Sequence, residues 1–201
     1  MIKVGNEYID FINKLFTNNP PDYSTNNEYD VKVFDDCHKM VEAIKKKDKG
    51  FNRLRRVISG YSFYWRVKAR DKTDTRYNQD YDFEIDRYKF SWNENFNACD
   101  FISNLKNIEK IGCIYTVQEH NLNYADVIFV EDISYNQETK QIEYHPDKLI
   151  DTYSKSTDIS KIIQNISNTY KFLLIRGVYG IYIYAVDKNL RKFISSLVNE
   201  D

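Results

Sequence analysis

The sequence has no phosphate-binding loop. None of its 201 residues falls in a G-x-x-x-x-G-K-[ST] pattern, the loop that cradles nucleotide phosphates. Its three cysteines are widely spaced and include no C-x-x-C pair, so neither a zinc site nor a disulfide framework is expected. No apolar run approaches the ~18 residues needed to cross a bilayer. The first residues carry no signal-peptide pattern. We therefore expect a cytoplasmic protein without a membrane partner.

Charge of one sign is not in excess either. The chain has 29 Lys and Arg against 30 Asp and Glu, a net charge of -1. Overall charge therefore does not predict a nucleic-acid partner, and a local basic face would be needed. The three histidines, at positions 38, 120 and 145, lack metal-ligand spacing, so no metal site is predicted.

The apolar residues, 42% of the chain, suffice for one core. We expect a single domain over residues 1–201, with insertions at 61–110 and 131–158. The run Val127 to Val130 is continuously apolar, which is typical of a strand buried on both faces of a parallel sheet. Strands alternate with helices, which predicts an α/β fold with a mostly parallel sheet and helices on both faces. The helices are expected at 8–16, 37–44, 159–174 and 190–197, the strands at 31–33, 56–60, 111–117, 127–130 and 181–186, a hairpin at 83–90 and a loop at 20–29.

Two segments carry the most specific patterns. Residues 112–129 read G-C-I-Y-T-V-Q-E-H-N-L-N-Y-A-D-V-I-F, and residues 173–184 read L-L-I-R-G-V-Y-G-I-Y-I-Y. With residues 6–12 and 59–65, they resemble, in order, four motifs of the Schlafen group 3-like DNA/RNA helicase domain family, a relative of superfamily 1 helicases. The resemblance covers the C-terminal RecA-like half of the motor. It implies a three-layer fold of the P-loop NTPase type that lacks the Walker A loop.

The resemblance also implies roles for particular residues. In such motors ATP lies between two RecA-like domains, and Arg176 matches the arginine that the second domain brings to the γ-phosphate. Lys3, Gln118, Glu119 and Gly177 match positions near the nucleotide. ATP and Mg²⁺ are therefore expected only in complex with a separate P-loop domain, and no ATPase activity is expected from this chain alone. The alternative for Arg176 is a surface ion pair.

Nucleic acid, single-stranded or duplex, is the other expected partner. Tyr61 and Trp65 stand among basic residues, and such a pattern suits a nucleic-acid site in which aromatic rings stack on bases and cations neutralise the phosphate backbone. The alternative is that these aromatic residues belong to the core and lie beside solvated basic residues. Thr116 and Asn123 belong to the fifth motif, which contacts nucleic acid in helicases. The alternative for Thr116 is a set of local capping hydrogen bonds.

A second hypothesis is a non-catalytic protein-interaction module that uses the former interdomain face. Two departures from the family pattern favour it: Glu119 replaces glycine and Ile175 replaces threonine. A third departure, Lys3 in place of arginine, keeps the charge but loses the bidentate fork. A carboxylate at 119 would repel a phosphate. A nuclease would need a carboxylate cluster. Residues 80–86 hold four acidic side chains, but no legible base accompanies them.

Overall fold

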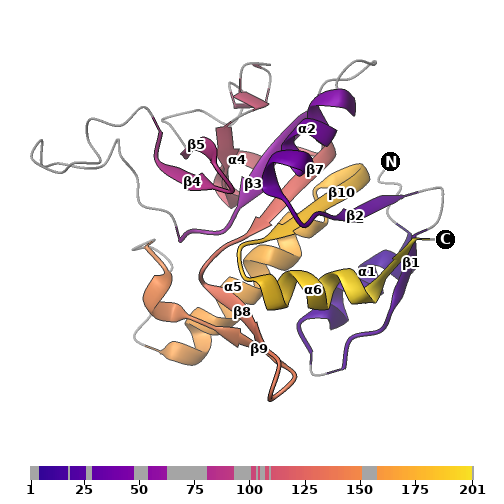
Figure 1. Ribbon diagram of the computed structural model, residues 1–201, viewed down its shortest axis with the longest axis vertical. Helices are drawn as coiled ribbons and strands as arrows, with labels where there is room; N and C mark the ends of the chain where they lie inside the picture. Colours follow the sequence, from indigo (N-terminus) through magenta and orange to yellow (C-terminus); the bar gives the residue numbers. More distant parts are fainter. Residues whose placement is uncertain are drawn as a thin grey trace, which may run out of the picture.

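The computed structural model describes residues 5–17, 19–25, 29–47, 54–62, 81–92, 101–102, 104, 107–108, 110–150 and 158–200. A central sheet of seven strands runs through these residues, in the order β2-β10-β7-β3-β6-β5-β4 (Figure 1). All neighbours from β2 to β5 pair in parallel, and β4 and β5 pair as an antiparallel hairpin. The strands of this sheet are β2 Asp30–Val33, β3 Arg55–Ser59, β4 Phe83–Ile85, β5 Tyr88–Trp92, β6 Lys110–Gly112, β7 Leu122–Phe129 and β10 Gly177–Ala185.

Helices cover both faces of the sheet, which makes the fold a three-layer α/β architecture (Figure 1). One face packs against α1, α5 and α6, and the other packs against α2. Alternation along the strands explains why the central runs are apolar throughout: Val127 faces the first layer, whereas Ile128 faces α2. The helices are α1 Asn6–Leu15, α2 Cys37–Lys47, α4 Ile114–Val117, α5 Ile159–Leu174 and α6 Lys188–Leu197.

The helices α5 and α6 each begin at an aspartate. The Asp158 side chain accepts a hydrogen bond from the Ser160 N–H at 2.9 Å at the start of α5. Asp187 accepts one from the Leu190 N–H at 2.7 Å at the start of α6. These contacts satisfy N–H groups that have no partner inside the helix. None of the described helices is long and apolar enough to span a membrane.

Two smaller pairs flank the central sheet. The hairpin of β8 Ile133–Asn136 and β9 Gln141–Tyr144 turns at 137–140, as the polar residues there predict, and the short 3-10 helix η4 Pro146–Lys148 follows it. The strands β1 Tyr23–Thr25 and β11 Val198–Glu200 pair in parallel. Residues 20–29 were expected to form a loop, and this expectation was wrong at β1. Its partner lies about 175 residues later, so no local pattern announces it.

The strand expected over 111–117 was also wrong in its second half. The strand ends at Gly112, and α4 begins at Ile114. Thr116 explains the change, because its Oγ1 accepts a hydrogen bond from the Cys113 N–H and donates one to the Cys113 carbonyl, both at 2.8 Å. Such side chain to backbone bonds compete with strand pairing. The hairpin predicted at 83–90 is confirmed, and β5 runs on to Trp92 and pairs with β6, so the hairpin extends the central sheet.

Candidate nucleotide and nucleic-acid interface

Arg176 lies between the end of α5 and the start of β10. Its guanidinium carbon stands 3.9 Å from the centre of the Phe172 ring, one helical turn earlier, so the two side chains stack. The side chain is half-buried, and burial lowers the pKa of the guanidinium from its ordinary value. Among the described residues no carboxylate pairs with it, and its buried Nε has no hydrogen-bond partner. Within the described part of the chain, Arg176 is thus a cation stacked on an aromatic ring, without a carboxylate partner.

Two buried tyrosines donate hydrogen bonds to the backbone of residues 174–177, the junction between α5 and β10. The Tyr8 hydroxyl, on α1, donates to the Leu174 carbonyl at 3.0 Å. The Tyr29 hydroxyl donates to the Gly177 carbonyl at 3.1 Å. Burial raises the pKa of both phenols, so both remain protonated donors. The carbonyls on either side of Arg176 are therefore fixed by hydroxyls from other parts of the chain.

Glycine at 177 and 180 is required by close backbone approach. A Cβ at Gly177 would meet the Gly180 carbonyl oxygen at 2.1 Å, and one at Gly180 would meet the Asp30 carbonyl oxygen at 2.3 Å. Gly177 pairs with Leu122 and Gly180 with Tyr124, so β10 carries one extra residue here. This β-bulge re-aims the side chains of β10. The exposed Tyr179 ring, 41% accessible, lies 6.5 Å from the Tyr124 ring as a result.

The strands β10, β7 and β3 begin side by side, and Tyr124 lies at the centre of this edge. The ammonium of Lys47 lies 4.7 Å from the Tyr124 ring centre, and the Arg55 guanidinium carbon lies 5.6 Å from it. Lys47 also donates to Asp30 at 2.5 Å and to the Tyr124 hydroxyl at 3.2 Å. Burial acts to lower the pKa of Lys47, but these hydrogen bonds outweigh it and raise that pKa. We call Lys47, Arg55, Tyr124 and Tyr179 the amino-edge patch.

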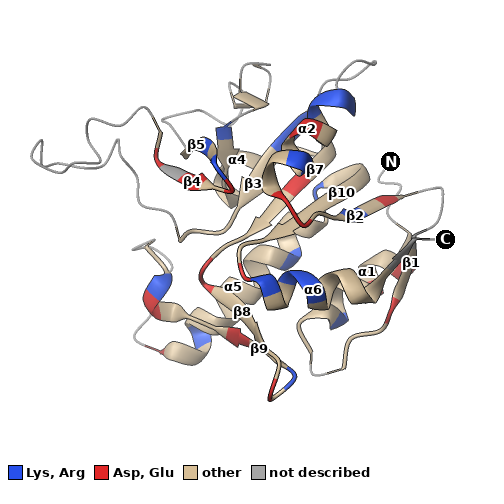
Figure 2. Ribbon diagram, in the orientation of Figure 1, with Lys and Arg blue, Asp and Glu red and all other residues tan. Residues whose placement is uncertain are grey.

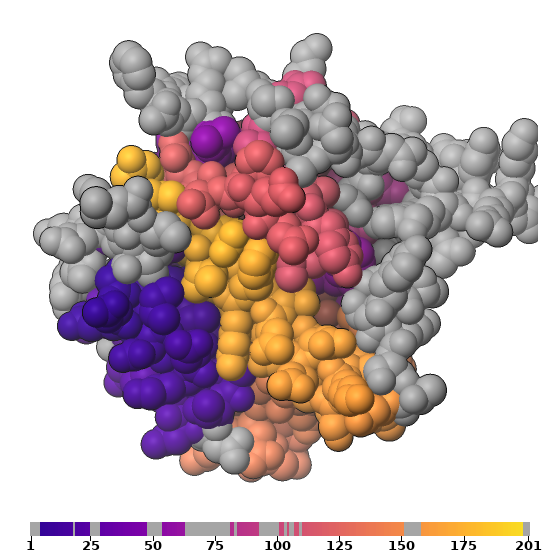
Figure 3. All heavy atoms as spheres, turned by 180° about the vertical axis from the view of Figure 1, so that it is seen from behind, coloured from indigo at the N-terminus to yellow at the C-terminus, as the bar shows by residue number. Residues whose placement is uncertain are grey.

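The fifth motif leads into the same edge. Gln118 and Glu119 are exposed in the turn after α4, and the chain then enters β7, where the Leu122 N–H donates to the Arg176 carbonyl at 2.9 Å. Asn123 is half-buried in β7, and its N–H donates to the Leu54 carbonyl at 2.6 Å. Seen from behind, the pink surface of this region borders the yellow-orange surface of α5 and the start of β10 (Figure 3). The two motifs are thus joined by a backbone hydrogen bond.

Other predicted site residues lie elsewhere. Thr116 is buried in α4, with its hydroxyl engaged by Cys113. Tyr61 follows β3 at the opposite edge of the sheet, where its hydroxyl donates to the Cys113 Sγ at 2.9 Å and its ring contacts Trp92 and Tyr115. Lys3 and Trp65 lie outside the described residues. The roles predicted for all of these residues stay predictions.

The structure shows candidates that sequence reasoning missed. Tyr8 and Tyr29 looked like ordinary core residues, because nothing local links them to a strand start more than 140 residues away. Phe172 had a usable signal, since it lies in the last turn of α5, four residues before Arg176. Within the part of the chain that the structure describes, no group of three His, Cys, Asp or Glu could hold a metal ion. Of the acidic run at 80–86, Asp82 accepts from the Trp92 N–H and Asp86 from the Tyr184 hydroxyl, so both have structural partners.

Comparison with known proteins identifies the family of the chain. The family described as Schlafen group 3, DNA/RNA helicase domain, matches residues 2–187. A protein of Saccharomyces cerevisiae, described as uncharacterized protein YPL245W, is 34% identical over 176 residues, which are 82% of this chain and 36% of that protein. The chain thus spans about a third of the length of the curated relative that it matches. No solved structure matches the chain. The match covers the four motifs and the strands that carry them, and the chain therefore belongs to the Schlafen group 3 DNA/RNA helicase domain family.

Proposed function

We propose that this chain is the second, C-terminal RecA-like half of a nucleic-acid motor. It assists ATP hydrolysis only when a P-loop domain docks on the face that carries Arg176 and the amino-edge patch. The observation that carries the proposal is Arg176, a cation stacked on Phe172 with no carboxylate partner among the described residues. A guanidinium held this way can spread positive charge over phosphate oxygens as negative charge develops on them. ATP and Mg²⁺ would be held by the P-loop domain, and this chain would supply Arg176 as the arginine finger that contacts the γ-phosphate.

Preorganisation of the junction supports the same role. A finger residue stabilises a transition state best when its position is set before the substrate arrives. Here the carbonyls of Leu174 and Gly177 are fixed by the Tyr8 and Tyr29 hydroxyls. The Arg176 carbonyl is fixed by the Leu122 N–H. Docking of a P-loop domain would therefore meet a rigid backbone rather than a loop that must be ordered.

Single-stranded nucleic acid is the second partner in this proposal. The amino-edge patch offers the exposed Tyr179 ring for stacking, beside Tyr124. The Lys47 ammonium, paired with Asp30, lies over the Tyr124 ring, and the buried Arg55 lies on the same ring. Aromatic rings and cations together hold single strands without base-specific hydrogen bonds. Figure 2 shows Lys and Arg gathered at the end of α2, which reaches this edge. The patch lies in the same row of strand starts as Arg176, so one partner face could serve both roles.

The nucleic-acid part is tested by fluorescence anisotropy with labelled 20-nucleotide DNA and RNA across a salt series. We expect affinity to fall steeply with salt and Tyr179→Ala to weaken binding about tenfold, since stacking on one ring contributes ~1–3 kcal/mol. Tyr115→Ala is the matched control, because Tyr115 is also exposed but lies beside Tyr61. Loss of binding in Tyr115→Ala alone would place the nucleic acid at Tyr61 instead. No binding at ~100 μM protein in low salt would favour the protein-interaction alternative.

The finger role is tested with a P-loop domain of the same family, whose ATP hydrolysis is measured with and without this chain. We expect the stimulation of ATP hydrolysis by Arg176→Ala to be at least ~10³-fold smaller than the stimulation by the wild-type chain. Arg176→Lys should restore little of it, because lysine lacks the bidentate fork. Association should be measured separately, by sedimentation. Equal stimulation by the wild-type chain and Arg176→Ala would rule out the finger.

A further inference from the structure

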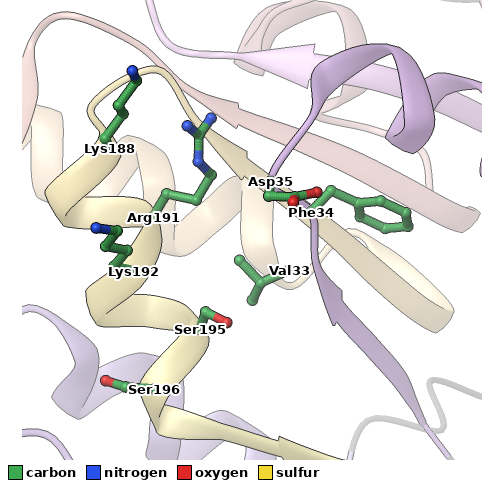
Figure 4. Close-up of a pocket in the computed structure, with 8 residues that line it drawn as sticks. All are labelled: Val33, Phe34, Asp35, Lys188, Arg191, Lys192, Ser195 and Ser196. Carbon is green, nitrogen blue, oxygen red and sulfur yellow. The ribbon is translucent and has the colours of Figure 1, made fainter.

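A cavity opens at the edge of the sheet opposite to Arg176. It lies between the end of β2 and the face of α6, and its volume is about 540 Å³ (Figure 4). In this view Arg191 and Ser195 reach from α6 toward the chain at Val33 and Asp35, whereas Lys188 and Lys192 extend from the rim. This volume falls in the range of small-molecule sites, roughly 300–1,000 Å³.

The topology of the sheet places this cavity at a recurrent kind of binding position. β2 and β10 are parallel neighbours. After β2 the chain continues into α2 on one face of the sheet, and after β10 it continues into α6 on the other face. Two neighbouring strands whose connections leave to opposite faces open a crevice outside their carboxyl ends. Open α/β sheets bind ligands at such points.

The lining is positively charged. Lys188, Arg191 and Lys192 stand on one side, and Asp35 is the carboxylate on the other, with Lys39 at 3.9 Å from it. Arg191 is held in place, because it donates to the Ala185 carbonyl at 3.1 Å and lies 4.6 Å from the Tyr184 ring centre.

A second carboxylate near Arg191 belongs to Asp86. It accepts from the Tyr184 hydroxyl at 2.7 Å and from the Cys37 N–H at 3.1 Å. Burial alone would raise the pKa of Asp86, but these hydrogen bonds, with Arg191 and Lys188, lower it. The Asp86 charge is therefore already stabilised by hydroxyl and amide donors, and the three cations of α6 outnumber the single carboxylate that lines the cavity.

We propose that this cavity binds the phosphate group of a nucleotide-sized ligand, with Arg191, Lys188 and Lys192 as its cations and Ser195 as a hydroxyl donor. Arginine offers a planar fork, lysine a mobile point charge and serine a short donor, a combination that suits phosphate oxygens. The phosphate has two possible sources, a free mononucleotide or a nucleic-acid strand. The site is separate from the proposed motor face and does not depend on it, because α6 lies at the carboxyl edge and follows the last residue that the family matches.

The test is calorimetric titration of the full chain with AMP, adenosine, inorganic phosphate and an unlabelled 10-nucleotide DNA. Ser195→Glu places a carboxylate on the cavity side of α6. Ser196→Glu places the same charge on the next residue, which also lines the cavity but whose side chain extends to the other side of the helix in Figure 4 and donates to the Phe193 carbonyl at 2.7 Å. Both sites are exposed and lie in the last turn of the helix, so their effects on folding should match. Thermal unfolding of both variants checks this.

We expect AMP to bind and adenosine not to bind, and Ser195→Glu to weaken AMP about tenfold more than Ser196→Glu does, because two like charges a few ångströms apart repel. Lys188→Glu should weaken AMP similarly, because Lys188 is one of the cations that line the cavity. DNA binding that Ser195→Glu abolishes, without AMP binding, would assign the phosphate to a strand. Equal affinity in Ser195→Glu and the wild type, or binding of none of the phosphate probes, would overturn the proposal.

Discussion

At the scale of single residues, glycines and buried hydroxyls decide how the Arg176 junction is built. Gly177 and Gly180 admit a backbone approach that any side chain would block, and Tyr8 and Tyr29 fix the carbonyls beside it. The motif that contains Arg176 could be recognised in the sequence, but the hydrogen bonds from Tyr8 and Tyr29 that position it could not. They come from residues whose pattern indicates only burial.

Replacement of Gly177 by alanine should therefore destabilise the protein. Its new Cβ would meet the Gly180 carbonyl oxygen at 2.1 Å, and backbone cannot give way as a side chain tip can. We expect a loss of about 3 kcal/mol in the free energy of unfolding, measured by urea denaturation. Gly5→Ala is the control, because nothing lies within 4 Å of a Cβ there, and its effect should stay within ~0.5 kcal/mol. Similar losses in both variants would contradict the steric argument.

Asp132 should make stability depend on pH. Burial raises the pKa of this carboxyl from 3.8 to about 6, although the Tyr170 hydroxyl, which donates to it at 2.6 Å, acts to lower it. The folded state then holds a proton that the unfolded state releases, so stability contributed by this group is present below pH ~4 and is lost as pH rises to 6. The loss amounts to at most about 3 kcal/mol.

Asp132→Asn is the matching variant, because its amide oxygen can still accept from Tyr170 but does not titrate. Urea denaturation at pH 4.5, 5.5 and 7 should give a flatter stability profile for Asp132→Asn than for the wild type. Parallel profiles would show that Asp132 is not the group responsible. Asp126 is buried in β7, with neither carboxylate oxygen hydrogen-bonded to a described residue. Burial raises its pKa too, so it contributes to the remaining slope with the same sign.

At the scale of elements, the aspartates at the starts of α5 and α6 fix where these helices begin. Asp187 caps α6 and also accepts a hydrogen bond from the Tyr135 N–H at 3.1 Å, which ties α6 to β8. Asp158 caps α5 from an exposed position. Removal of Asp187 therefore breaks a tertiary contact as well as a cap.

We expect Asp187→Ala to cost about 2 kcal/mol and Asp158→Ala about 1 kcal/mol of unfolding free energy. Chemical denaturation of the two variants side by side gives both values. A loss at position 187 of no more than about 1 kcal/mol, the usual value of a cap alone, would mean that the Tyr135 contact contributes nothing.

Elements whose signal is local were predictable, and those defined by a distant partner were not. The periodicity of residues 159–174 and the apolar run at 127–130 predicted α5 and the core of β7. The pair of β1 and β11 was missed because three residues on each side carry no pattern of their own. The end of β6 was missed because one hydroxyl, on Thr116, redirects the chain. For the site, Arg176 was placed from its motif, whereas Tyr124 and Tyr179 meet only through a bulge.

At the scale of the whole molecule, β10 joins the two halves of the sheet. It is the described partner of β2 and also pairs along most of β7. A chain that ends at residue 176 should therefore lose cooperative unfolding in urea, because β2 loses the strand that joins it to the rest of the sheet and α6 is lost with β10. A chain that ends at residue 197 keeps β10 and loses only β11, and it should unfold cooperatively with a lower midpoint. Cooperative unfolding of the shorter chain would refute a linking role for β10.

The position of β10 has a consequence for synthesis on the ribosome. The strand that fills the gap between β2 and β7 is the last strand of the central sheet to be made. Until residues 177–185 leave the exit tunnel, the nascent chain presents unpaired edges at β2 and β7, and open strand edges invite pairing with other chains. The sheet can close only after residues 177–185 have been made, so chaperones that shield nascent strands should matter more for this topology than for one assembled in sequence order.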